Sequence, residues 1–144
     1  MWIVYAMVAS MLWGLMYVLN EQVFKTLSIS FSYLVTFTAG ALVFLILSLQ
    51  QGVLSRDIQV LMSQRQIQWF LALDIVVFLV AEIFIALSIT HKNATLAGLV
   101  EISYPVFIAI FAYLIFKQEV LNIGVLAGGL LIFSGIFVVF HFNQ

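Results

Sequence analysis

The chain consists of long apolar runs separated by short polar interruptions. Each run is continuously apolar, whereas a membrane-spanning strand alternates apolar and polar residues at every second position. A helix needs about 20 apolar residues to cross a bilayer, and each run is about that long. The pattern therefore predicts an all-α membrane protein with five transmembrane helices, at residues 2–18, 31–49, 69–89, 96–116 and 121–140.

The longest polar connection, residues 50–68, carries a helical pattern of its own. Ile58, Leu61 and Met62 share one face at helical spacing, and the residues between them are polar or charged. We expect a short interfacial helix that lies on the membrane and is capped at its N-terminus by Ser55. An ordinary solvated loop is the alternative.

The composition excludes a water-soluble globule. Of the 144 residues, 65% are hydrophobic and 8% are charged, and the mean hydropathy is +1.24; soluble domains carry about 25% charged residues. A net charge of −1 offers no basic surface to nucleic acid, and the absence of cysteine excludes disulfides and thiol chemistry. The start of the chain, Met1-Trp2-Ile3, lacks the positive region of a signal peptide, so we expect the first helix to be retained.

The positive charges are nearly balanced across the predicted membrane. Arg56, Arg65 and Lys117 fall on the side of the N-terminus, whereas Lys25 and Lys92 fall on the opposite side. The positive-inside rule therefore favours a cytoplasmic N-terminus by a margin of one charge. Such a balance is also typical of a protein that inserts in both orientations.

Two glutamates lie at matched depth in consecutive apolar runs. Glu82 is nine residues before His91, and Glu101 is eight residues after Asn93, at the two ends of the turn between the runs. At about 1.5 Å of helical rise per residue, both acids lie roughly 12–14 Å below the same membrane surface. Helices joined by a tight turn are neighbours, so we expect the two side chains to meet. Charged residues at this depth are costly and mark ion or substrate pathways.

The membrane interior supplies no base for its acids. Every lysine and arginine falls in a predicted loop or span end, whereas Asp74, Glu82 and Glu101 fall inside predicted spans. Either these acids are protonated, or they face a wet cavity and meet a cation that the protein does not supply. Both states suit a proton-coupled or cation-binding transporter. The alternative is that each acid hydrogen-bonds a neighbouring helix and has only a structural role.

Pro105 lies four residues after Glu101. Because proline has no N–H, it cannot donate the helical hydrogen bond to the Glu101 carbonyl oxygen. We therefore expect a kink that presents a carboxyl group and a free carbonyl in one turn, as broken helices do in transporter cavities. A kink used only for packing is the alternative.

Polar residues in the first two runs form a weaker signal. Tyr33, Thr36 and Gly40 recur at helical spacing in the second run, and Tyr17 with Asn20 ends the first. These side chains either line a cavity or satisfy neighbouring helices.

The fifth run carries a face of small residues. Gly124 and Gly128 form a GxxxG pair, which Gly129, Ser134 and Gly135 extend. Small residues let helix backbones approach closely, so we expect a packing or dimer interface at the four glycines. Spacing leaves open whether the partner helix belongs to the same chain or to another.

The sequence contains no catalytic or metal-binding constellation. The two histidines, His91 and His141, are far apart and near span ends, and no hydrolase, zinc-protease or phosphate-loop motif is present. We expect neither enzymatic activity nor a cofactor or metal.

Several segments together carry a family resemblance. They are residues 94–100, the Tyr104-Pro105-Val106-Phe107 run, Glu119, and the glycine-rich stretch 124–135; Leu12-Trp13-Gly14 resembles an opening motif. In these features the chain resembles EamA-type members of the drug/metabolite transporter superfamily. The family usually has a glycine before the glutamate that follows the fourth span, whereas Lys117-Gln118 precede Glu119 here.

The resemblance implies a five-helix unit, which we expect to form a single domain over residues 1–144 in the cell (inner) membrane. It implies transport of amino acids, metabolites, drugs or sugars, and Trp13 and Tyr104 of its motifs join the candidate substrate site. The unit usually occurs twice in ten-helix exporters, and with an odd number of spans the second copy must be inverted. We therefore expect a homodimer, inverted in topology, or a pair with a sister subunit, that works by alternating access. The alternative is a non-transporting membrane subunit that assembles through the fifth span.

Overall fold

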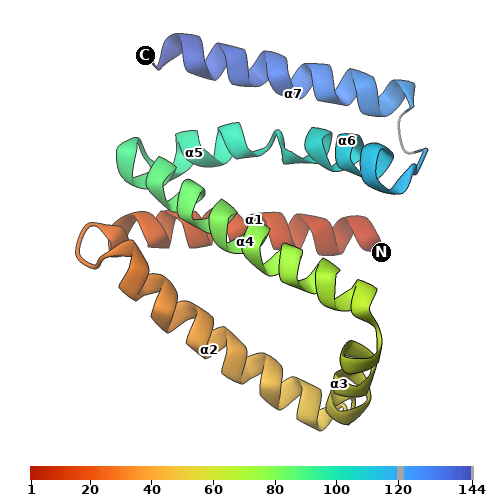
Figure 1. Cartoon of the computed structure of the whole chain (residues 1–144). Coiled ribbons are helices and arrows are strands. Elements are labelled where there is room, and N and C mark those ends of the chain that lie inside the picture. The colour runs from red at the N-terminus through yellow and green to blue at the C-terminus, as the bar shows by residue number, and fades with distance from the viewer. Residues whose placement is uncertain (120–121, 144) are drawn as a thin grey trace. The chain divides into compact units, whose positions relative to one another are not determined.

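The computed structural model describes residues 1–119 and 122–143. Within these residues the regular structure is α-helical and contains no strand, which confirms the predicted fold class. Five segments are long and apolar enough to cross a membrane (Figure 1). The protein is therefore a multi-pass membrane protein. The helices are α1 (Trp2–Phe24), α2 (Ile29–Gln50), α3 (Leu54–Ser63), α4 (Arg65–His91), α5 (Ala94–Glu101), α6 (Tyr104–Phe116) and α7 (Ile123–Phe142).

The predicted boundaries need two remarks. The first span is predicted to end at residue 18, but α1 continues through the polar run Asn20-Glu21-Gln22 to Phe24. A polar run at the end of a span need not end the helix, because α-helical hydrogen bonds continue into the headgroup region. Leu121, the predicted start of the fifth span, lies outside the described residues.

Side-chain caps explain where several helices begin. The hydroxyl of Ser28 accepts a hydrogen bond from the Phe31 N–H at 3.3 Å, and the side-chain oxygen of Asn93 accepts one from the Leu96 N–H at 2.8 Å. Asn122 caps α7 in the same way. The first N–H groups of a helix have no helical partner, so serine and asparagine are favoured at these positions.

The short helix predicted between the second and third spans is present as α3. Its predicted cap is wrong, because α3 begins at Leu54 and its N-cap is Val53, which makes no side-chain cap hydrogen bond. The chain turns earlier than expected at Gly52, whose φ of 66° is accessible mainly to glycine. Ser55 therefore lies inside the helix. The position of α3 on the membrane surface stays a prediction.

The turn after α6 is left-handed at Lys117. Its φ is 56°, and its N–H donates to the carbonyl oxygens of Ala112 and Tyr113 at the helix end, where the Ala112 oxygen also accepts the Gln118 N–H at 3.2 Å. The ammonium group of Lys117 lies 5.6 Å from the centre of the Tyr113 ring. A cation–π contact thus accompanies a backbone conformation that glycine adopts more readily.

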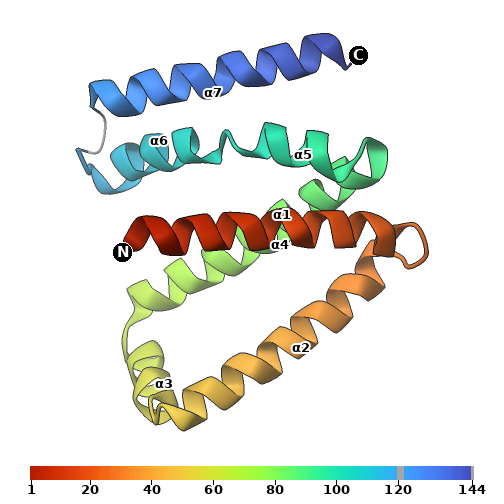
Figure 2. The same cartoon turned by 180° about the vertical axis from the view of Figure 1, so that it is seen from behind.

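The chain packs as two compact units, Met1–Glu21 with Ser88–Gln144, and Gln22–Leu87. In the first unit α7 lies beside α5 and α6 in both views (Figures 1 and 2). Gly129 permits this approach, since a Cβ atom added there would lie 3.3 Å from Cγ2 of Val106 on α6. The ammonium group of Lys92 also donates to the carbonyl oxygen of Asn143 at 3.0 Å, which ties the end of α7 to the start of α5.

Aromatic rings connect α2 and α4 in the second unit. The Tyr33 and Phe37 rings stack at a centroid distance of 5.1 Å, and the Phe37 ring lies 5.5 Å from that of Phe78. The Tyr33 hydroxyl donates to the backbone carbonyl oxygen of Glu82 at 3.0 Å. Hydrogen bonds of this kind give a buried tyrosine hydroxyl the partner that it needs inside a membrane protein.

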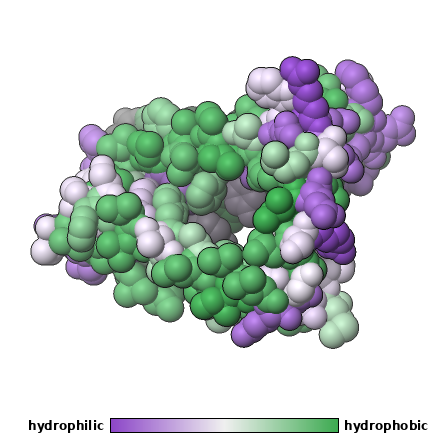
Figure 3. Space-filling view, turned by 60° about the horizontal axis from the view of Figure 1, so that its bottom comes forward, coloured by the Kyte–Doolittle hydropathy of each residue, from purple (hydrophilic) through white to green (hydrophobic). Residues whose placement is uncertain are grey.

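Most large apolar side chains remain exposed on the chain. Figure 3 shows hydrophobic residues over most of one face, with hydrophilic residues gathered toward its margins. The few buried residues are mainly alanines and tyrosines. Lipid is as apolar as the side chains themselves, so membrane helices associate through small residues and hydrogen bonds rather than through apolar burial.

Candidate functional site

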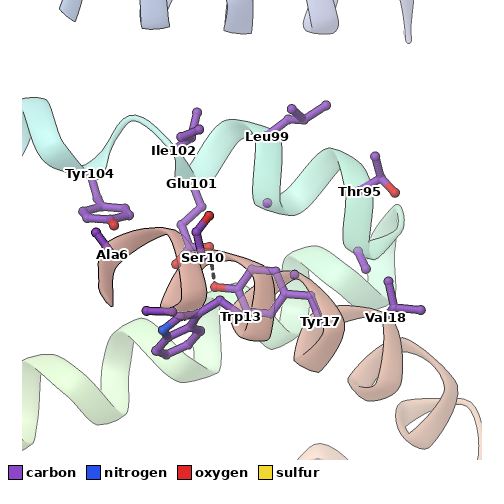
Figure 4. A pocket seen from close by; sticks show the side chains of 14 residues that line it. Ala6, Ser10, Trp13, Tyr17, Val18, Thr95, Leu99, Glu101, Ile102 and Tyr104 are labelled. Carbon is purple, nitrogen blue, oxygen red and sulfur yellow. Dashed lines mark hydrogen bonds between the residues drawn. The ribbon is translucent and has the colours of Figure 1, made fainter. Parts of the chain in front are cut away.

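The first unit contains a cavity of about 780 Å³ between α1 and the chain from α5 to the start of α6 (Figure 4). Pockets for small molecules typically have volumes of roughly 300–1,000 Å³. The lining residues on each helix share one face and recur every three or four positions: Ala6, Ser10, Trp13 and Tyr17 on α1, and Ala94, Gly98 and Glu101 on α5. The cavity is therefore large enough for an organic solute.

Glu101 is the one charged side chain that the described residues contribute to the cavity lining. It is the last residue of α5, roughly 10 Å along the helix axis from Ala94 at about 1.5 Å per residue. Its side chain is partly buried, and it extends from α5 toward α1 (Figure 4). This places the acid well inside the apolar span, where a charge needs a partner or water.

Tyr17 holds the Glu101 carboxyl group. Its hydroxyl donates a hydrogen bond to Oε2 of Glu101 across the cavity, from α1 to α5. Tyr17 itself is buried, with 7% of its surface exposed. A buried tyrosine has only two side-chain torsions and its ring is confined by packing, so it fixes one carboxylate oxygen in space.

Two neighbours hold the Tyr17 ring in turn. Trp13, one helical turn earlier on α1, meets it edge to face at a centroid distance of 6.1 Å. Gly98 of α5 also lies against the ring, because an added Cβ atom there would come 3.4 Å from Cδ2 of Tyr17. The absence of a side chain at Gly98 is what gives the ring its place against α5.

The helix that carries Glu101 is interrupted directly after it. Ile102 and Ser103 separate α5 from α6, and Pro105 occupies the first turn of α6, where its missing N–H is tolerated. This confirms the interruption predicted from the proline. The carbonyl of Glu101 receives no bond from Pro105, and Tyr104 of the new helix lines the cavity.

Glu21 accepts a hydrogen bond at the N-terminus of α5, at the opposite end of the helix from Glu101. Its Oε2 accepts a hydrogen bond from the backbone N–H of Ala94 at 2.7 Å, while Asn93 caps the N–H of Leu96. A negative charge is favoured at a helix N-terminus because of the helix dipole. Because α1 extends beyond its predicted end, it carries Glu21, whose carboxylate links α1 to the N-terminus of α5.

A family model described as the EamA-like transporter family matches residues 1–141. The chain belongs to the EamA-like transporter family. Searches among curated proteins and among solved structures found no match. EamA-like proteins are membrane transporters of small molecules rather than enzymes, and membership confirms the resemblance seen in the motifs.

In this EamA-like protein the predicted site residues divide between the two units. Trp13, Glu101 and Tyr104 line the cavity of the first unit, and Pro105 lies next to it. Glu82 belongs to the second unit, and its pairing with Glu101 stays a prediction.

The remaining predicted residues lie on α2 and α4. Tyr33 is buried and bonded to the Glu82 carbonyl, whereas Thr36 on α2 and Asp74 on α4 are exposed on the chain. Among residues 1–119 and 122–143, no three histidine or acidic side chains gather as metal ligands do.

Several residues that build the cavity carry only a weak signal in the sequence. Tyr17 was noted as a polar end of the first run, and Ser10, Gly98 and Glu21 were not singled out. The available signal was spacing: Ser10 and Tyr17 lie on the same helical face as Trp13, which the family motif had already marked. Which helix this face meets is a property of tertiary packing.

The glycines of α7 have different surroundings. Gly129 faces Val106 of the same chain, whereas an added Cβ atom at Gly128 or Gly135 would meet nothing within 4 Å. At Gly124 the nearest atom is the side-chain oxygen of its neighbour Asn122, at 3.1 Å. The predicted glycine face therefore contains one contact with another helix, at Gly129, and a stripe at Gly128 and Gly135 where no atom of the described chain lies within 4 Å of an added Cβ atom.

Proposed function

We propose that this protein is one half of a small-molecule transporter, in which the cavity of the first unit is the substrate site and Glu101 is the group that binds substrate or proton. The observation that carries the proposal is a partly buried carboxyl group, held by a buried tyrosine, in a cavity of about 780 Å³ inside a membrane-spanning unit. A residue with only a packing role needs no such cavity beside it.

The same carboxyl group supports proton coupling. No basic side chain of the described residues lines the cavity, so Glu101 has to be neutralised by a proton or by a cation from solution. If a proton and a cationic substrate bind to Glu101 in turn, transport of the substrate is coupled to transport of the proton. Glu82 modifies this exchange if the two acids meet as their depths predict.

The proposed active form is a dimer that works by alternating access, with two copies of a single five-helix domain in opposite orientations. Gly128 and Gly135 lie four and eleven residues after Gly124, which puts the three glycines on one face of α7. Because Gly129 is the one glycine of these four that faces another helix in the part of the chain that the structure describes, this stripe is available to a second copy or a sister subunit. We place the dimer in the inner cell membrane.

The absence of native cysteine permits a direct test of the transport site. Ser10→Cys places a thiol in the cavity lining, and a bulky maleimide attached there should abolish uptake into proteoliposomes of any solute that wild-type protein transports, from a panel of labelled amines, amino acids and sugars. Ser63→Cys on α3 carries the same label outside the cavity and should transport normally. Unimpeded uptake by labelled Ser10→Cys protein would place the pathway elsewhere, and no uptake of any solute by wild-type protein would favour an accessory role.

Topology gives a separate test of the inverted dimer. With three positive residues against two, we expect the chain to insert in both orientations, so a membrane-impermeant thiol reagent should modify part of a Ser63→Cys population and part of a Thr26→Cys population from outside the cell. Permeabilised cells provide the full extent of labelling. Complete protection of one site and complete labelling of the other would contradict self-pairing in opposite orientations.

A further inference from the structure

The chemistry of the cavity lining favours one class of ligand. The described residues give it one acidic side chain, Glu101, and no basic one, while its aromatic residues are Trp13, Tyr17 and Tyr104. An anion would meet a carboxylate with no compensating charge. A cation would neutralise the acid, and aromatic faces attract cations through their ring quadrupole.

We propose, on the basis of the transport function above, that the cavity binds organic monocations that have an apolar body and carry no acid group. The ammonium group donates hydrogen bonds to the Glu101 carboxylate, whose Oε2 also accepts the Tyr17 hydroxyl. The apolar body lies along the aromatic side chains of Trp13 and Tyr104. A bare inorganic ion would leave most of the cavity, which is largely apolar, without a partner.

The N-terminus of α5 explains why an amino acid is not the preferred ligand. This helix end borders the cavity at Ala94, and helix N-termini commonly bind carboxylates. Here three of the first four N–H groups of α5 are already taken: that of Ala94 donates to Glu21 at 2.7 Å, that of Leu96 to the Asn93 side chain at 2.8 Å, and that of Ala97 to the Asn93 carbonyl oxygen at 3.1 Å.

The Glu21 carboxylate therefore already fills the position at the N-terminus of α5 where a substrate carboxylate would bind. A zwitterion would have to displace Glu21, or place its own carboxylate away from the N–H groups of Ala94, Leu96 and Ala97 and close to a second negative charge. The selectivity for an amine over the corresponding amino acid thus comes from α1, which carries Glu21, and from the Asn93 cap.

Three probes that share a phenylethyl body test this assignment. Phenethylamine is a cation at pH 7, 2-phenylethanol is its neutral isostere, and phenylalanine adds a carboxylate to the amine. In displacement of radiolabelled phenethylamine from wild-type protein in nanodiscs, we expect phenethylamine to bind at least about tenfold more tightly than either competitor, because a hydrogen bond to a charged group contributes about 1.5–3 kcal/mol. Equal binding of 2-phenylethanol, or equal or tighter binding of phenylalanine, would overturn the proposal.

Glu21→Ala tests the source of the selectivity. Removal of this side chain frees the Ala94 N–H, so phenylalanine should gain several-fold in affinity relative to phenethylamine, whereas Asp57→Asn on the exposed surface of α3 should leave the ratio unchanged. An unchanged ratio in folded Glu21→Ala protein would contradict the role of the α5 N-terminus. Uptake of a neutral or zwitterionic solute that is blocked by label at Ser10→Cys would retain the transport function and overturn only this ligand class.

Discussion

Replacing Glu101 with glutamine is expected to reduce proton-linked transport at least about tenfold while leaving membrane insertion and assembly intact. The amide is nearly isosteric with the carboxyl group, and its oxygen can still accept the hydrogen bond from Tyr17. It cannot carry a negative charge or exchange a proton at neutral pH. The variant therefore removes the chemistry of the site and keeps its shape.

Proton release measures this effect directly. Phenethylamine added to detergent-solubilised wild-type protein in weak buffer should release protons as the cation replaces them, and the Glu101→Gln protein should release none. Asp57→Asn makes the same carboxyl-to-amide change outside the cavity and should behave as wild type. Glu82→Gln is expected to shift the pH dependence of transport without abolishing it. Wild-type rates and an unchanged pH profile in Glu101→Gln protein would return this acid to a structural role.

Leucine substitutions at two adjacent glycines of α7 should affect different properties: stability for Gly129→Leu and dimer formation for Gly128→Leu. At Gly129 even a Cβ atom would lie 3.3 Å from Val106 Cγ2, so Gly129→Leu should destabilise the packing of α7 on α6 by about 1–3 kcal/mol. At Gly128 an added Cβ atom meets nothing within 4 Å, so Gly128→Leu should leave the monomer stable. The same substitution should lower the dimer fraction, because it fills the stripe proposed to receive the second copy.

The two glycine variants serve as each other's control. Thermal unfolding in detergent should register Gly129→Leu and not Gly128→Leu, while cross-linking or light scattering should register loss of dimer in Gly128→Leu at wild-type stability. A Gly128→Leu protein that is as dimeric as wild type would place the interface on another helix. Unchanged stability of Gly129→Leu would mean that α7 can move away from Val106 at little cost.

The sequence determined the parts of this protein that depend on local chemistry. Continuous apolar runs predict five membrane-spanning helices. In lipid, every backbone N–H and C=O group must be hydrogen-bonded within the protein, and only a helix or a closed β-barrel achieves this. Pro105 determined the interruption after Glu101, since a missing N–H acts within one turn. The absence of an intramembrane base marked Glu101 as a residue that needs a partner.

Tertiary structure decided which residues surround the Glu101 carboxyl group. Tyr17 is 84 residues from Glu101 in the chain, and only the packing of α1 against α5 brings its hydroxyl to the carboxylate. The role of Glu21 is of the same kind, because an acid at the end of a span becomes a helix cap only when another helix begins beside it. In lipid, apolar surface does not specify which helix faces pair. The pairing depends on small residues such as Gly98 and Gly129 and on a few polar contacts, whose partners are set by three-dimensional packing rather than by spacing along the chain.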